Sequence, residues 1–263
     1  MTKLPKVLHN RDTYIDRIKP YIRTPIIKVM VGHRRVGKSF ILYQLIDLIR
    51  KEEKNANIIY INKEDIKFDS ILSYRDLYDY IAERLLSDSR NYIFIDEIQE
   101  IEDFKKAIRS LALDDNNDIY ITGSNSEMFS GDLANELGGR YVEFRIYSLS
   151  YLEFLNFHSL PNDDESLEKY THFGGLPYLI HLPLNEAVVM EYISSVYSTI
   201  VLRDVVSRKN IRNTAFLEQL IRFLANNVGS LFSSKSISDF LKNQKVNISP
   251  NQRSEEHTSE LQS

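Results

Sequence analysis

The sequence contains no cysteine among its 263 residues, and this absence removes several kinds of chemistry. Disulfides, thiolate nucleophiles, cysteine-ligated zinc and iron–sulfur clusters are excluded, and the absence fits a reducing compartment. No run approaches the roughly 18 to 20 apolar residues that a membrane span needs, and the first twenty positions lack a signal-peptide core. We therefore expect a cytoplasmic protein without a membrane segment.

Neither sign of charge dominates, since 33 Lys and Arg stand against 37 Asp and Glu. This balance gives no overall attraction to nucleic acid, so any such affinity must come from a local patch. Hydrophobic residues make up 43% of the chain, which is ordinary for a globular protein and argues against disorder. The length suits one large domain or two small ones.

The last eleven residues, 253–263, read RSEEHTSELQS and show no hydrophobic periodicity. They resemble the in-frame translation of a sequencing-adapter oligonucleotide, so we expect an artefact and exclude them from the fold. The alternative is a natural polar tail. On the first interpretation, the natural protein continues beyond Gln252.

Short apolar runs alternate with helical patterns over the first 150 residues. The runs that predict strands are 26–31, 57–62, 92–95, 119–122 and 141–146. The patterns that predict helices are 13–22, 77–86, 104–113 and a segment that begins near Lys38. This alternation indicates parallel βαβ units with helices on both faces of a sheet, in a first domain over 1–150.

After Ser150 the sequence shows helical stretches and no convincing strand. Helices are predicted at 186–206, 216–224 and 236–241, and Ser234 or Ser236 is available as the cap of the third. We expect an all-α region with two parts: a helical lid or linker at 151–207, and a truncated winged-helix-like module at 208–252.

Residues 32–39 read GHRRVGKS and fit the phosphate-loop pattern G-x-x-x-x-G-K-[ST]. The glycines allow a tight turn whose N–H groups converge on phosphate oxygens at a helix N-terminus. Lys38 can place its charge against the β and γ phosphates, and Ser39 can ligate Mg²⁺. A plain glycine turn is disfavoured because the motif follows an apolar strand and opens a helix. The predicted nucleotide-binding residues are Gly32, His33, Arg34, Arg35, Val36, Gly37, Lys38 and Ser39.

Two adjacent carboxylates, Asp96 and Glu97, follow the apolar run 92–95. Asp96 is placed to hold Mg²⁺ beside Ser39, and Glu97 can polarise the attacking water as a general base. A lone strand that ends in Asp-Glu is more often a solvated turn, but the phosphate loop upstream favours the functional interpretation.

Two weaker candidates follow. In Ile121-Thr122-Gly123-Ser124-Asn125 a strand ends in small polar residues that could sense the γ-phosphate or position the water, and the choice among Thr122, Ser124 and Asn125 stays open. A helix cap is the alternative use of such residues. Arg140 could supply transition-state charge in its own chain or to a neighbouring subunit, or could be a plain surface arginine.

In this order and spacing the motifs resemble the AAA+ ATPases, and the strings VGHRRVGKSFIL, FIDEIQ, ITGSN, LGGRYVEF and FGGLPYLI resemble one prokaryotic group among them. The resemblance spans about residues 11–247. It implies a P-loop NTPase fold, a nucleotide-binding loop at 32–39, Asp96 as the magnesium residue and Glu97 as the catalytic carboxylate. It also implies a helical region with a winged-helix module and a C-terminal domain. On this resemblance we expect that last domain to be missing here and the module to stop before its recognition helix.

The segment 203–252 carries eight basic and three acidic residues, a local charge of +5 in an acidic protein. This charge and two helices suit the opening of a winged helix-turn-helix, with salt-sensitive attraction to DNA phosphates. The alternative is a protein–protein spacer whose lysines keep one face solvated.

These residues together predict an Mg²⁺-dependent ATPase in which water attacks the γ-phosphate of ATP. Hydrolysis would move the helical region relative to the sheet domain, and a homo-oligomer would allow Arg140 to act on a neighbour. One alternative is a low-turnover, nucleotide-dependent switch or DNA-associated scaffold. A small-molecule kinase is disfavoured because Glu97 directly follows Asp96 and no acceptor pocket can be named.

Overall fold

The computed structural model describes residues 5, 8–124, 137–200, 214–231 and 233–243. The chain divides into two compact units, Met1–Met190 and Glu191–Ser263. The predicted artefact at 253–263 and Asn125 lie outside the described residues.

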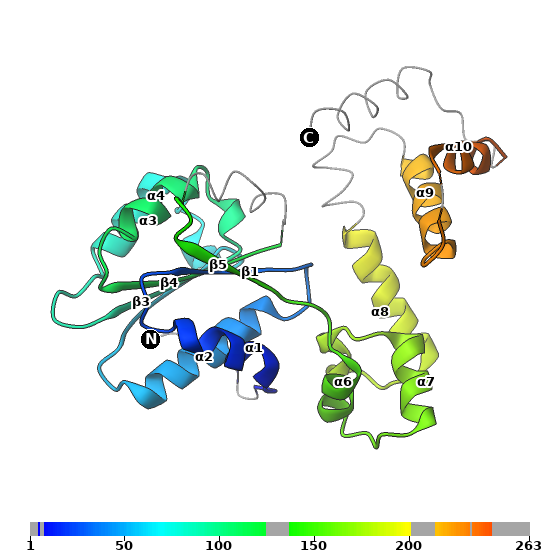
Figure 1. Ribbon diagram of the computed structural model, residues 1–263, viewed down its shortest axis with the longest axis horizontal. Helices are drawn as coiled ribbons and strands as arrows, with labels where there is room; N and C mark the ends of the chain where they lie inside the picture. Colours follow the sequence, from blue (N-terminus) through cyan, green and yellow to red (C-terminus); the bar gives the residue numbers. More distant parts are fainter. Residues whose placement is uncertain (1–4, 6–7, 125–136, 201–213, 232, 244–263) are drawn as a thin grey trace. The chain divides into compact units, whose positions relative to one another are not determined.

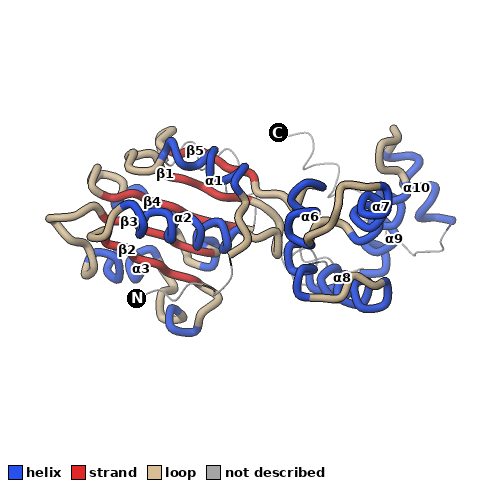
Figure 2. The backbone as a smooth tube through the Cα atoms, turned by 90° about the horizontal axis from the view of Figure 1, so that it is seen from below, coloured by secondary structure: helices blue, strands red, loops and turns tan. Residues whose placement is uncertain are grey.

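The first unit is built on a five-stranded sheet in which all paired strands are parallel (Figures 1 and 2). Its order is β2-β3-β4-β1-β5. The strands are β1 (Ile27–Val31), β2 (Asn57–Asn62), β3 (Asn91–Asp96), β4 (Asn117–Gly123) and β5 (Tyr141–Arg145). Every run predicted to be a strand forms one. Because the strands are parallel, their carboxyl ends meet at one edge of the sheet, where ligands of such folds bind.

Helices cover both faces of the sheet, as the alternation of strands and helices predicts (Figure 1). The helices α1 (Asp12–Ile18) and α2 (Lys38–Glu52) lie on one face, and α3 (Tyr74–Ala82) and α4 (Phe104–Leu111) lie on the other. Side chains alternate between the faces: Met30 packs in the α1 and α2 core, whereas Val29 and Val31 pack in the α3 and α4 core. Because an apolar core lies on each face of the sheet, β1 is buried throughout.

Local hydrogen bonds move some helix ends away from their predicted positions. The helix α3 begins at Tyr74 because Ser73 and Asp76 form a capping box: the Asp76 carboxylate accepts from the Ser73 N–H at 2.8 Å. It ends at Ala82, so the predicted bounds of 77–86 were wrong at both ends. The helix α1 stops at Ile18, and a 3₁₀ turn, η1 (Lys19–Tyr21), follows it.

The described residues after Ser150 are helical and contain no strand. In the first unit they form α6 (Tyr151–His158), α7 (Asp164–Phe173), the 3₁₀ helix η5 (Pro177–His181) and the start of α8 (Glu186–Thr199). The second unit contains α9 (Thr214–Asn226) and α10 (Ser234–Asn243). The predicted continuation of α8 to 206 lies outside the described residues. No helix in the described ranges is long and apolar enough to cross a membrane.

The cap of α10 differs from the prediction. Ser233 precedes the helix, and its hydroxyl accepts from the Ser236 N–H at 3.2 Å, while the Ser236 hydroxyl accepts from the Ser233 N–H at 2.9 Å. The capping residue is therefore Ser233, not Ser234 or Ser236, although Ser236 completes the reciprocal pair.

Candidate nucleotide-binding site

The loop 32–37 connects the carboxyl end of β1 to the first turn of α2, and both of its glycines have a steric reason. A Cβ at Gly32 would lie 2.3 Å from the Ile146 carbonyl oxygen, a distance that no side chain tolerates. Gly37 has a φ of +94°, in the left-handed region that favours glycine, and it precedes α2 without a side-chain cap. The first turn of α2 therefore presents its N–H groups to the loop, as an anion site requires.

Lys38 connects the loop to the acidic end of β3. Its side chain is only 4% exposed, and Nζ donates to the His33 carbonyl oxygen at 3.1 Å. The same Nζ lies 3.2 Å from Oε1 of Glu97. The structure therefore brings the predicted lysine and the predicted general base into one ion pair.

Asp96 is buried at the end of β3 and is surrounded by hydroxyl groups. Its Oδ1 accepts from Thr122 Oγ1 at 2.5 Å, its Oδ2 accepts from Tyr60 Oη at 3.3 Å, and the Ser39 hydroxyl is a third hydrogen-bond partner. Burial raises the pKa of Asp96, and the hydrogen bonds from Ser39 and Thr122 oppose that rise only in part. Ser39 and Asp96, which the sequence assigns to one magnesium site, are in direct contact.

Glu97 has a φ of +54°, a backbone conformation that is uncommon for residues other than glycine. Its N–H donates to Thr122 Oγ1 at 3.0 Å, so one hydroxyl connects Asp96 to Glu97. Burial alone would raise the pKa of Glu97, but the charge of Lys38 and a hydrogen bond from Gln99 lower it overall. Glu97 is therefore held as a carboxylate at neutral pH.

Gln99, in the 3₁₀ helix η3 (Ile98–Glu100), is a site residue that was not among the predicted ones. Its Nε2 donates to Glu97 Oε2 at 2.5 Å and to Ser124 Oγ at 3.3 Å. Its Oε1 is buried and has no partner among the described groups. Only the string FIDEIQ pointed to this position, because a lone glutamine carries no periodic or charge signal.

The third motif contributes through Thr122 and Ser124. Thr122, in β4, is fully buried between the two acids, and Ser124 reaches Glu97 through Gln99. Both residues thus lie beside the predicted catalytic carboxylate. The structure does not describe Asn125, the third candidate of this motif, so the choice among the three residues stays open and a role for Asn125 stays a prediction.

Arg140 lies at the opposite edge of the sheet. Its carbonyl oxygen accepts from the Ile27 N–H at 2.9 Å, at the start of β1, whereas the phosphate loop follows Val31 at the other end of that strand. About 13 Å of strand separates the two ends. The structure therefore contradicts the expectation that Arg140 could act at the loop of its own chain. A contact with a neighbouring subunit stays a prediction.

The remaining loop residues have different surroundings. The Arg34 guanidinium lies 3.8 Å from the carboxylates of both Glu64 and Glu100, and Arg35 has a φ of +67°. The Val36 side chain is buried in the α1 and α2 core, and its carbonyl oxygen accepts from Arg11 Nη1 at 2.9 Å. No sequence motif pointed to Arg11 either.

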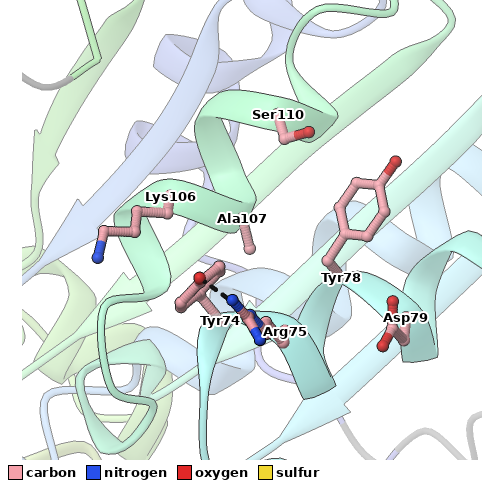
Figure 3. A pocket seen from close by; sticks show the side chains of 7 residues that line it. All are labelled: Tyr74, Arg75, Tyr78, Asp79, Lys106, Ala107 and Ser110. Atoms are coloured by element: carbon pink, nitrogen blue, oxygen red, sulfur yellow. Dashed lines mark hydrogen bonds between the residues drawn. The ribbon is translucent and has the colours of Figure 1, made fainter.

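A shallow pocket of about 270 Å³ opens between α3 and α4 (Figure 3). It is lined by Tyr74, Arg75, Tyr78, Asp79, Lys106, Ala107 and Ser110, and it shares no residue with the site above. Arg75 donates to Tyr74 Oη at 3.0 Å, and the Lys106 ammonium lies 5.1 Å from the centre of the same ring. Tyr74 thus already contacts both cations, and the pocket volume is small for a ligand site.

Comparison with known proteins identifies the family of the first domain. Residues 24–155, about half of the chain, match a family model described as an AAA domain. Residues 164–251 match a second model, described as a domain of unknown function. This second match spans parts of both the 151–207 and the 208–252 segments.

Two curated relatives, both described as uncharacterised proteins, are similar over most of this chain. One, from Haemophilus influenzae, is 35% identical over 92% of this chain and 62% of its own length. The other, from Methanocaldococcus jannaschii, is 32% identical over 95% of this chain and 56% of its own length. The chain thus spans about 60% of the length of these relatives.

Among solved structures, Cdc6p from Pyrobaculum aerophilum is similar with a TM-score of 0.46 and 14% identity, over 66% of this chain and 57% of that one. AMPPCP-bound DnaA from Aquifex aeolicus is similar with a TM-score of 0.42 and 17% identity, over 89% of this chain and 76% of that one. The parallel sheet is of the type expected for the matched AAA domain family. The chain therefore belongs to the AAA domain family, with a P-loop NTPase fold of the AAA+ type followed by a helical region.

Proposed function

We propose that this protein binds ATP with Mg²⁺ and hydrolyses it, and that hydrolysis drives a conformational change. The observation that carries the proposal is the convergence of Lys38, Ser39, Asp96 and Glu97 at the carboxyl edge of one parallel sheet. Membership of the AAA domain family supports nucleotide binding. Hydrolysis is argued from the site itself.

The residues present fit a magnesium ion. Ser39 and Asp96 offer a hydroxyl and a carboxylate oxygen in direct contact with each other, and Mg²⁺ is typically held by one or two such groups together with substrate phosphates. When bound, the ion would neutralise phosphate charge. The Thr122 and Tyr60 hydroxyls keep the Asp96 carboxylate in place.

The ion pair between Lys38 and Glu97 would break when ATP binds. The β and γ phosphates offer Lys38 more negative charge than Glu97 does, so its ammonium would turn toward them. Glu97 would then remain ionised beside Gln99, with one oxygen released to orient water and accept its proton. Asn125 could help to position that water, and Arg140 of a neighbouring copy in a homo-oligomer could add positive charge.

The experiment compares the chain with Glu97→Gln and Lys38→Met. We expect measurable ATP turnover in the unaltered chain and a loss of at least ~100-fold in Glu97→Gln, because a positioned general base contributes about that much. Calorimetry should show ATP binding retained in Glu97→Gln and weakened in Lys38→Met. Equal, near-zero rates of the unaltered chain and Glu97→Gln, with binding intact, would instead favour the low-turnover switch.

DNA is a separate proposed partner, supported by the local charge of +5 over 203–252. Phosphate contacts would make this binding strongly salt-dependent. A titration with duplex DNA at 50 and 200 mM salt tests it, and absence of binding at either salt concentration would favour the protein–protein spacer. Because this chain spans about 60% of the length of its longer relatives, the activity and partners of the whole protein are also proposals.

A further inference from the structure

Arg11 is a buried cation that precedes α1 and reaches the back of the phosphate loop. Its side chain is 2% exposed. Nη1 donates to the carbonyl oxygens of Val36 at 2.9 Å and Tyr147 at 3.0 Å, and Nη2 donates to that of Ser148 at 3.4 Å. Nε and Nη2 also bind the Glu153 carboxylate at 2.8 and 3.1 Å. These bonds match the five N–H donors of a guanidinium, so this group is saturated.

The partners of Arg11 belong to the phosphate loop and to two adjacent segments more than 100 residues further along the chain. Val36 lies in the phosphate loop, Tyr147 and Ser148 lie in the connector 146–150 after β5, and Glu153 lies in the first turn of α6. Glu153 also forms a capping box with Ser150, whose N–H donates to it at 2.8 Å. One side chain thus joins the loop to the start of the helical region.

Other contacts place the loop against the same connector. The Ile146 N–H donates to the Val31 carbonyl oxygen at 2.7 Å, and the Ile146 carbonyl oxygen fills the space that a Cβ at Gly32 would need. At the other end of the loop, a Cβ at Gly37 would lie 3.7 Å from Pro177 and 4.0 Å from Arg11 Nη1. The loop is therefore packed against the connector and Arg11.

The backbone of Arg11 is also fixed to α2. Its N–H donates to Gln44 Oε1 at 3.0 Å, and Gln44 Nε2 donates to the His9 carbonyl oxygen at 2.9 Å. Burying a guanidinium is costly unless its partners are held in good geometry. Here both the side chain and the backbone of Arg11 are held, and the Val36 carbonyl is fixed by them.

We propose that Arg11 is a positioning residue for nucleotide binding, which holds the loop in its phosphate-binding shape and couples occupancy of the loop to α6. The inference rests on the proposed function, because it assumes that the loop binds ATP. It differs from a purely stabilising role in one respect. Loss of the guanidinium should change ATP affinity in a protein that is still folded.

The test uses two variants and one control in the full chain. Arg11→Lys keeps the charge but cannot serve three carbonyls and a carboxylate, and Glu153→Gln keeps the shape but removes the countercharge. The control, Asp118→Asn, alters another buried ion pair, Lys28–Asp118, at the far edge of the sheet. Each protein is checked for folding by circular dichroism and melting temperature, and ATP affinity is measured by calorimetry with Mg²⁺.

We expect ATP to bind at least ~10-fold more weakly to Arg11→Lys, and more weakly in the same direction to Glu153→Gln, whereas Asp118→Asn stays within about twofold of the unaltered chain. Hydrogen exchange supplies a second readout. ATP should slow exchange in peptides covering 150–158 of the unaltered chain, and should slow it less in Arg11→Lys.

The outcomes separate the two proposals. If the unaltered chain binds no ATP, the proposed function fails and this inference fails with it. If the unaltered chain binds ATP and both variants bind it equally well, with only their melting temperatures lowered, Arg11 is a structural residue. In that case the inference is overturned while the proposed function stands.

Discussion

The sheet holds a buried lysine–carboxylate pair at each of its two edges, and the pairs differ in what surrounds them. Lys28 and Asp118 lie near the amino ends of β1 and β4, and both side chains are fully buried. Lys28 also donates to the Thr24 carbonyl oxygen, and Asp118 accepts from the Arg23 N–H and Tyr120 Oη. Each member of this pair is thus also hydrogen-bonded to other protein groups.

The pair at the carboxyl edge, Lys38 and Glu97, is differently built. Lys38 directly follows Gly37 of the loop, and the neighbouring Gln99 has a buried oxygen without a partner among the described groups. Glu97 has a φ of +54°, but Arg23 beside Asp118 also has a positive φ, so the unmet hydrogen-bonding capacity is what differs. Such capacity calls for an explanation, and a functional role is one. The comparison supports the proposal that the second pair exchanges with a ligand, and we expect the first pair to stabilise the fold.

The largest expected effect is at the amino edge. Lys28→Met leaves Asp118 buried without its countercharge, so we expect the free energy of unfolding to fall by ~3–5 kcal/mol. Chemical denaturation measures the loss. The double variant Lys28→Met/Asp118→Asn should recover part of it, because no charge is then left buried. A loss below about 1 kcal/mol would contradict the view that this pair is structural.

A smaller loss is expected at the carboxyl edge without nucleotide. Lys38→Met removes a group that lowers the pKa of Glu97, and we expect ~1–3 kcal/mol of destabilisation at pH 7. The folded-state pKa of Glu97 lies below its ordinary value of 4.5, so the stability from its charge is complete above that value and is lost as pH falls through the folded-state pKa.

Denaturation at pH 7 and at pH 3 checks this. The difference between the unaltered chain and Lys38→Met should shrink as the pH falls, because protonation of Glu97 removes its attraction to Lys38. A difference that grows as pH falls would contradict the assignment of the effect to Glu97.

The third prediction concerns Gln99, which holds the Glu97 carboxylate through Nε2. Gln99→Leu should lower kcat of ATP hydrolysis by ~10-fold, equivalent to about 1.4 kcal/mol in the barrier, with the ATP Kd almost unchanged. Gln99→Glu, of similar shape, should be worse because two carboxylates would face each other. Loss of binding instead of turnover would show that Gln99 shapes the nucleotide loop and not the base.

Motif residues and cores could be predicted from the sequence because their information is local. The run 92–95 followed by Asp96 and Glu97 specifies a buried strand and two acids at its end, and the glycine spacing of the loop specifies Lys38. Helix ends were less predictable, as the Ser73–Asp76 box shows, because one capping hydrogen bond outweighs apolar periodicity.

Arg11 and Gln99 could not be predicted in the same way. Arg11 has most of its partners on backbone carbonyls and on Glu153, 142 positions away, and no local pattern encodes such contacts. The expectation that Arg140 could act within its own chain failed for a related reason. A short motif does not tell which end of a strand it stands beside, and the register of β5 against β1 decides it.

Arg140 gives the smallest expected effect within one chain. The residue is exposed at the amino edge, away from the loop, so Arg140→Ala should leave both the ATP Kd and the free energy of unfolding unchanged within error. If Arg140 acts on a neighbouring copy, the specific ATPase rate of the unaltered chain should rise with protein concentration, and that of Arg140→Ala should not. A concentration-independent loss of rate in Arg140→Ala would place its role within its own chain and would contradict the edge assignment.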